Sequence, residues 1–149
     1  MKMVLIPIKS KYTAEIYAET KKWEYRKWQR PERIHGYNDF FFALYETSPI
    51  SKITGIVQVI DHLEGWYEDL WDQTQEFAGI SHLDLVRYYW RTITAHAYRL
   101  HNPMLITPVT PKEINAPVPR KYIFLTDVQS KLVTSKIIDP IAFNRISFL

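Results

Sequence analysis

The sequence contains no cysteine among its 149 residues. This absence excludes disulfide bonds, thiolate metal sites and cysteine nucleophiles. Glycine is scarce as well, with four residues, and the sequence has neither a glycine-rich phosphate loop nor a G-x-S-x-G nucleophile elbow. The catalytic classes that depend on these two motifs are therefore not predicted.

Long apolar runs are also missing. No uncharged stretch approaches the roughly 18 apolar residues that a membrane span needs. Residues 1–11 lack the apolar core and the cleavage pattern of a signal peptide. We therefore expect a cytoplasmic protein with no membrane partner. The five histidines show no H-x-H or H-E-x-x-H spacing, so we expect neither a metal nor another cofactor. The oligomeric state stays open.

Charge is unevenly distributed along the chain. Up to Gly36 there are nine lysines or arginines against four acidic residues, whereas between Lys52 and Arg87 there are seven acidic residues and no basic one. A basic segment attracts polyanions, because each neutralised phosphate releases counterions. Aromatic residues make up 15% of the chain, which suits either a large core or stacking on bases. Composition alone does not distinguish a polyanion-binding surface from an ordinary solvated one.

Hydrophobic periodicity predicts a mixture of strands and helices. Helices are expected over residues 11–19, 65–77 and 81–91, the last opened by Ser81 with Asp84 as a capping pair. Strands are expected over residues 3–8, 23–28, 40–45, 53–60, 93–100 and 121–126. Five prolines within residues 103–119 predict a long loop with at most a short helical turn near Lys112. This order is typical of an α+β protein with a small, partly closed mixed β-barrel of five or six strands and peripheral helices.

The segment from Glu19 to Arg26, E-T-K-K-W-E-Y-R, carries a specific pattern. It resembles the G-x-K-x-x-E-x-R motif of the ASCH domain family at Lys21, Glu24 and Arg26, with Glu19 in place of the glycine. Residues 45–55, 79–81 and 117–122 resemble later segments of the family in the same order. The resemblance implies a PUA-like domain over residues 1–126. Residues 127–149 would then form a C-terminal extension that packs on or extends the barrel, with residues 146–149 as an edge strand or dimer contact.

The matched residues also suit a binding site. Lysines between a helix and a strand can present ammonium groups to phosphate. Glu24 and Arg26, two residues apart on one strand face, can hold each other or contact a ligand. Trp28 is expected on the same face as a ring for base stacking, and the turn around Pro49 offers hydroxyls and a lysine. The candidate ligand-binding residues are therefore Lys21, Lys22, Glu24, Arg26, Trp28, Ser48, Ser51 and Lys52. A structural ion pair and a plain turn are the alternatives.

The resemblance implies more than one function. Most ASCH domains are regarded as RNA-binding modules, so RNA or a nucleotide is the favoured partner. Some small bacterial members are enzymes, either amidohydrolases acting on N4-acetylcytidine or a nuclease, and in that case Lys21 and Glu24 are the candidate catalytic residues. The threonine nucleophile of the amidohydrolases falls on Glu24 here, so only a variant with Glu24 as general base and Lys21 as oxyanion stabiliser is chemically possible. A protein-interaction module is the third alternative, marked by a large exposed aromatic patch away from Lys21.

Overall fold

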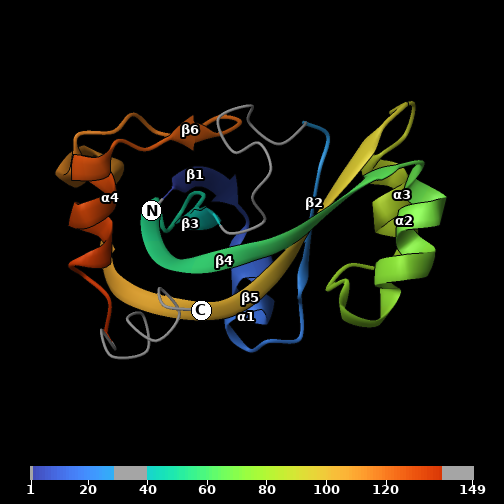
Figure 1. The fold of residues 1–149 in the computed structure, drawn as a ribbon, viewed down its shortest axis with the longest axis horizontal. Helices are drawn as coiled ribbons and strands as arrows, with labels where there is room; N and C mark the ends of the chain where they lie inside the picture. The colour runs from blue at the N-terminus through green and yellow to red at the C-terminus, as the bar shows by residue number, and fades with distance from the viewer. Residues whose placement is uncertain (1, 29–39, 139–149) are drawn as a thin grey trace.

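A curved mixed sheet forms the centre of the molecule, in a computed structural model that describes residues 2–28 and 40–138 (Figure 1). The sheet order is β2-β5-β4-β3-β1-β6. β1 pairs with β3 in parallel, and the other four described pairings are antiparallel. The strands are β1 (Met3–Ile8), β2 (Trp23–Arg26), β3 (Phe40–Glu46), β4 (Lys52–Gly65), β5 (Ala95–Val109) and β6 (Ile123–Phe124). Within the described ranges the edge strands β2 and β6 do not pair with each other, so the barrel is only partly closed. The predicted α+β fold is confirmed.

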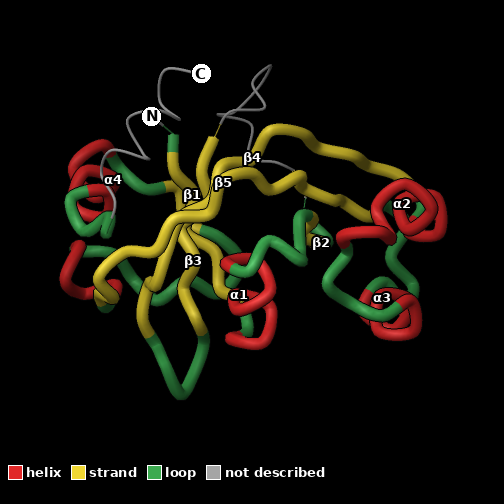
Figure 2. Tube along the Cα trace, turned by 90° about the horizontal axis from the view of Figure 1, so that it is seen from below, coloured by secondary structure: helices red, strands yellow, loops and turns green. Residues whose placement is uncertain are grey.

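The helices lie at the two ends and along one side of this sheet. They are α1 (Ser10–Tyr17), α2 (Tyr67–Thr74), α3 (His82–Tyr88) and α4 (Asp127–Thr134), with short 3-10 helices η2 (Gln75–Phe77) and η3 (Pro111–Ile114). Figures 1 and 2 place α2 and α3 at one end of the molecule and α4 at the other, with α1 between them. Across residues 2–28 and 40–138, no helix is long and apolar enough to cross a membrane.

Three hydrophobic cores stabilise these elements. Alternate residues of β1 point to opposite faces of the sheet, so Leu5 packs in a core with Val133 of α4, while Ile6 packs in another with Ile16 of α1. A third core lies between α2, α3 and β2, where Leu85 and Tyr89 are fully buried. The third core fixes the position of α3 relative to β2.

The loop predicted over residues 103–119 is wrong for residues 103–109, because β5 continues to Val109. Pro103 lies between the paired residues His101 and Met104, where β5 has one residue more than β4. Pro108 lies in a second irregular stretch, where β5 has two residues more than β4. Proline has no N–H for a ladder hydrogen bond and is tolerated in a sheet at such bulges. Prolines therefore mark irregularities in the strand here, whereas residues 110–119 are a loop with one short helix near Lys112, as predicted.

The position of Trp28 also differs from the sequence prediction. β2 ends at Arg26, so the two-residue alternation that would place Trp28 beside Glu24 stops before it reaches this residue. The Trp28 ring is 8% exposed and packs against Phe42 and Tyr98. Trp28 is therefore a core residue. The predicted loop over residues 29–38 and the predicted contact at residues 146–149 lie outside the described residues.

We expect Trp28→Ala to lower the free energy of unfolding by about 3–5 kcal/mol, because it leaves a large cavity in the core. Trp90→Ala is the matched control: Trp90 is 65% exposed, and surface changes of this kind stay within about 0.5 kcal/mol. Chemical denaturation followed by circular dichroism measures both. Equal losses for the two variants would contradict the placement of Trp28 in the core.

Candidate functional site

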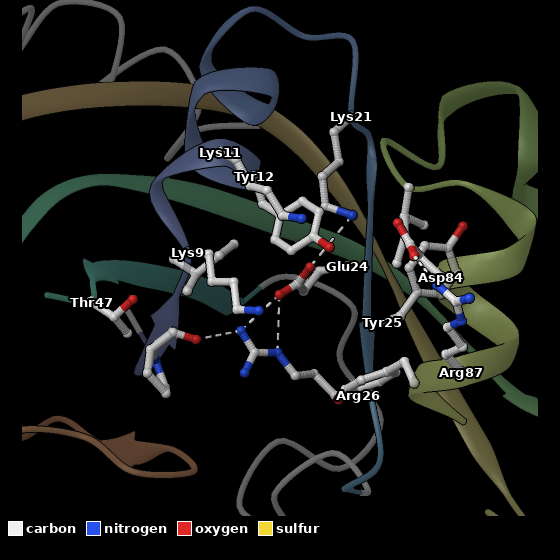
Figure 3. Close-up of a pocket in the computed structure, with 14 residues that line it drawn as sticks. Lys9, Lys11, Tyr12, Lys21, Glu24, Tyr25, Arg26, Thr47, Asp84 and Arg87 are labelled. Carbon is white, nitrogen blue, oxygen red and sulfur yellow. Dashed lines mark hydrogen bonds and ion pairs between the residues drawn. The ribbon is translucent and has the colours of Figure 1, made fainter. Parts of the chain in front are cut away.

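A cleft of about 600 Å³ opens between the start of α1, strand β2 and helix α3 (Figure 3). Residues far apart in the sequence meet there, because β2 lies between the two helices. The residues that line the cleft are Pro7, Ile8, Lys9, Lys11, Tyr12, Lys21, Glu24, Tyr25, Arg26, Thr47, Ile80, Asp84, Arg87 and Tyr88. All three residues of the K-x-x-E-x-R pattern are in this set.

Lys21, Glu24 and Arg26 form a connected charge network, which we call the floor of the cleft. Glu24 Oε2 accepts hydrogen bonds from Arg26 Nε at 3.0 Å and from Arg26 Nη2 at 2.7 Å. Its other oxygen, Oε1, lies 3.6 Å from Lys21 Nζ. Arg26 Nη2 also donates to the Pro7 carbonyl oxygen at 2.6 Å, which ties β2 to β1. The carboxylate of Glu24 is thus held between two cations.

The Lys21 side chain is fixed by the turn before α3. Its Nζ donates to the Ala78 carbonyl oxygen at 2.8 Å, and only 2% of the side chain is exposed. Its aliphatic stem lies directly over Gly79, where an added Cβ would be 2.5 Å from Cβ and Cγ of Lys21. Gly79 also has a φ of +63°, which favours glycine. The glycine at position 79 therefore gives Lys21 both the space and the turn that it needs.

Burial lowers the pKa of the Lys21 ammonium group below its ordinary value, and the nearby Glu24 carboxylate offsets part of that effect. Lys21 Nζ lies 5.0 Å from the centroid of the Tyr25 ring and 5.3 Å from that of Tyr12, so two aromatic faces also surround the amine. Burial raises the pKa of Tyr25 to about 12, so its phenol is neutral and shares a hydrogen bond of 2.7 Å with Thr74.

Two walls rise from this floor. Lys9, Lys11 and Tyr12 line one wall from the end of β1 and the start of α1, and α3 lines the other with Asp84, Arg87 and Tyr88 (Figure 3). In total the cleft is lined by five lysines or arginines and two carboxylates, a formal surplus of three positive charges. The K-x-x-E-x-R motif does not include these wall residues, so the sequence did not predict them as part of the site. Lys9 and Lys11 do belong to the basic N-terminal segment.

The structure does not bring every candidate residue to the cleft. Lys22 does not line the cleft: its Nζ lies 4.6 Å from the centroid of the Phe77 ring, and the residue lines a smaller hollow that it shares with Lys21. Ser48, Ser51 and Lys52 are exposed near the β3–β4 turn, and the cleft is instead lined by Thr47 of that region. Within the described ranges, no group of three or more histidine or carboxylate residues is placed to hold a metal ion.

Comparison with known proteins identifies the fold of the chain. No family model and no curated protein matches the sequence. Among solved structures, ASCH from Zymomonas mobilis has a TM-score of 0.80 at 20% identity, and the match covers 91% of this chain and 96% of that one. A single-residue variant of the same protein gives 0.81, covering 92% and 99%. The N-terminal domain of McrB from Staphylothermus marinus is more distant, with a TM-score of 0.60 at 11% identity over 90% and 93% of the two chains. The chain therefore has the fold of the ASCH domain, as the sequence resemblance predicts.

We expect Glu24→Gln to lower the pKa of Lys21 further and to destabilise the fold by up to about 3–5 kcal/mol, because the buried ammonium group loses its charged partner. Between the lowered pKa of Lys21 in the folded protein and its higher pKa in the unfolded chain, Lys21 is protonated only in the unfolded chain. The free energy of unfolding therefore rises with pH over this pH range. In Glu24→Gln this pH range extends to lower pH, because the pKa of Lys21 in the folded protein is lower still. NMR titration of the Lys21 side chain, together with unfolding at several pH values, measures both effects. An unchanged Lys21 pKa would contradict the coupling.

Proposed function

We propose that this protein binds single-stranded RNA or one of its nucleotides in the cleft above Lys21, Glu24 and Arg26. The observation that carries the proposal is a buried carboxylate, with 8% of its side chain exposed, held between two cations at the base of a positively charged cleft. Burying a carboxylate costs free energy unless it is paired with cations, and the two cations here also fix its position. The ASCH fold supports the proposal, because RNA binding is what the family resemblance implies.

The chemistry of the cleft suits a nucleotide. Lys9, Lys11 and Arg87 on the walls can contact phosphate oxygens. Glu24 on the floor can accept a hydrogen bond from an exocyclic amine of a base, as carboxylates do with cytosine N4. The rings of Tyr12 and Tyr88, which line opposite walls, offer faces on which an unstacked base can pack. The cleft thus offers separate contacts for the phosphate and for the base.

We expect binding of a short single-stranded RNA to weaken as salt rises, with a slope that Lys9→Ala and Lys11→Ala together reduce by up to about 1.4, given roughly 0.7 per phosphate contact. Fluorescence anisotropy at several salt concentrations measures the slope. Lys112→Ala with Lys131→Ala is the matched control, because η3 and α4 lie at the end of the molecule away from α3 (Figure 1). If both double variants change the slope equally, or if the wild type binds no RNA, the proposal is wrong.

A hydrolase is the second candidate, and the position of Lys21 favours it. Its amine lies 3.6 Å from the Glu24 carboxylate at the base of the cleft, an arrangement that can supply a general base beside a group that stabilises an oxyanion. The substrate class that the family resemblance implies is an acylated cytidine such as N4-acetylcytidine. Glu24 would then activate a water molecule, because position 24 offers no hydroxyl nucleophile.

If the protein is such a hydrolase, Glu24→Gln should lower the rate of acetate release from N4-acetylcytidine by roughly 10²- to 10⁴-fold, because the general base is lost. Asp84→Asn is the matched control, since it removes the other carboxylate that lines the cleft without touching the floor. Chromatography of the products, with enzyme and substrate at similar concentrations, gives the rates. No acetate release by the wild type would exclude this activity and leave RNA binding as the proposed function.

A further inference from the structure

Two aromatic side chains at the C-terminal end of α3 are exposed to solvent. Tyr88, the last residue of α3, lines the cleft and is 37% exposed, and Trp90 follows two residues later with 65% of its surface exposed. Large aromatic side chains are usually buried to a high degree, and Trp23 and Trp28 of this chain are both less than a tenth exposed. Two exposed aromatic residues close together at one end of a helix therefore mark a candidate contact surface.

The buried Tyr89 anchors the backbone between these two residues, and its ring centroid lies 4.8 Å from that of Tyr88. Tyr89, which lies between them in the sequence, is completely buried, and its hydroxyl donates to the carbonyl oxygen of His96 at 2.7 Å. The chain then turns at Arg91, which has a φ of +64°, and the turn is closed by a 2.7 Å hydrogen bond from the Thr92 amide to the Tyr89 carbonyl oxygen. A buried anchor flanked by two exposed rings is pre-organised for stacking, because little freedom is lost when a base packs on it.

Basic residues lie next to Tyr88 in space and next to Trp90 in the sequence. Lys27 Nζ lies 5.0 Å from the centroid of the Tyr88 ring. Arg87 lines the cleft with 71% of its side chain exposed, and Arg91 is exposed beyond Trp90. One carboxylate, Asp84, lies 3.9 Å from Arg87 Nη1 and offsets part of this charge. Exposed rings among cations are the combination that proteins use to bind single-stranded nucleic acid.

We propose that this surface, the α3 corner made of Lys27, Arg87, Tyr88, Trp90 and Arg91, is a second contact for single-stranded nucleic acid. It would hold the nucleotides that follow the one in the cleft. The inference rests on the proposed RNA binding and makes it more specific: the ligand is a strand of several nucleotides, and a free nucleotide fills only part of the site. Continuity supports this, because Arg87 and Tyr88 belong to both the cleft wall and the α3 corner.

The test compares two ligands on the same variants: uridine monophosphate and an eight-nucleotide oligouridine, both titrated by calorimetry. Trp90→Ala is expected to weaken binding of the octamer by about 5- to 150-fold, the range that stacking on one aromatic ring provides. Its affinity for the mononucleotide should not change. Val128→Ala is the matched control, because Val128 is a similarly exposed apolar residue, at 68%, on α4 at the other end of the molecule. It should bind both ligands like the wild type.

A second variant tests the charges of the corner. Lys27→Ala with Arg91→Ala should reduce the salt slope of octamer binding by up to about 1.4, at roughly 0.7 per phosphate contact, and leave the mononucleotide unaffected. An octamer of deoxythymidine is the third ligand. Equal weakening of its binding by Trp90→Ala supports contact through stacking and phosphate. Selective weakening of the RNA octamer also supports the corner and adds recognition of the ribose.

The outcomes separate the two proposals. If the wild type binds neither oligouridine nor the mononucleotide, the proposed function fails. If it binds both and Trp90→Ala changes neither, the α3 corner is overturned and the cleft stands. Equal losses for octamer and mononucleotide also overturn the corner, because the change would then act through the cleft.

The exposed Trp66 and Ile93 belong to the same inserted segment between β4 and β5. Normal RNA binding by Trp90→Ala with a smaller apparent mass on size-exclusion chromatography would therefore assign the corner to protein contact instead.

Discussion

The cleft depends on the buried carboxylate of Glu24. Removing a charge from water costs several kcal/mol unless it is paired and hydrogen-bonded, and Glu24 is paired on both sides, with Arg26 at 2.7 Å and Lys21 at 3.6 Å. Each cation is held in turn by a carbonyl oxygen from another element, Arg26 by Pro7 of β1 and Lys21 by Ala78 before α3. One carboxylate therefore fixes the mutual position of β1, β2 and the segment that leads into α3. The residues at the base of the cleft therefore also connect these three segments.

The second wall of the cleft reaches this position through the long strands β4 and β5. The two strands run together across the molecule (Figure 1), and α2 and α3 are inserted between them at one end. Pairing continues to Gly65 and Ala95, so the inserted helices start from a rigid base. The third core then packs Leu85 and Tyr89 of the α3 region against β2. As a result, α3 faces α1 across β2, and a cleft forms between segments that are more than 60 residues apart.

Whether a residue lies where its sequence pattern predicts depends on whether that position is set by its own strand or by distant segments. The spacing of Glu24 and Arg26 on one strand face is a local property, and the structure keeps it. The same periodicity fails for Trp28, because β2 ends two residues earlier, where no sequence signal marks its end. Lys21 and Lys22 are adjacent and chemically alike, yet one is buried beneath the cleft and the other lies over the Phe77 ring. The prolines of β5 predict a loop but lie in a strand, because a bulge depends on the partner strand as well as on the proline.

The sequence is enough to predict the α+β composition, most of the helices and strands, the motif on β2 and the basic character of the N-terminal segment. These are local patterns of hydrophobicity, capping and charge, and they are readable without knowledge of neighbours. Tertiary structure alone decided that Lys9 and Lys11 face Arg87 across a cleft, that the Lys21 amine is buried beside Ala78, and that Trp90 is exposed while Trp28 is not. The physical reason is that burial and pairing are set by contacts between distant segments, and an amino-acid pattern does not specify which segments meet.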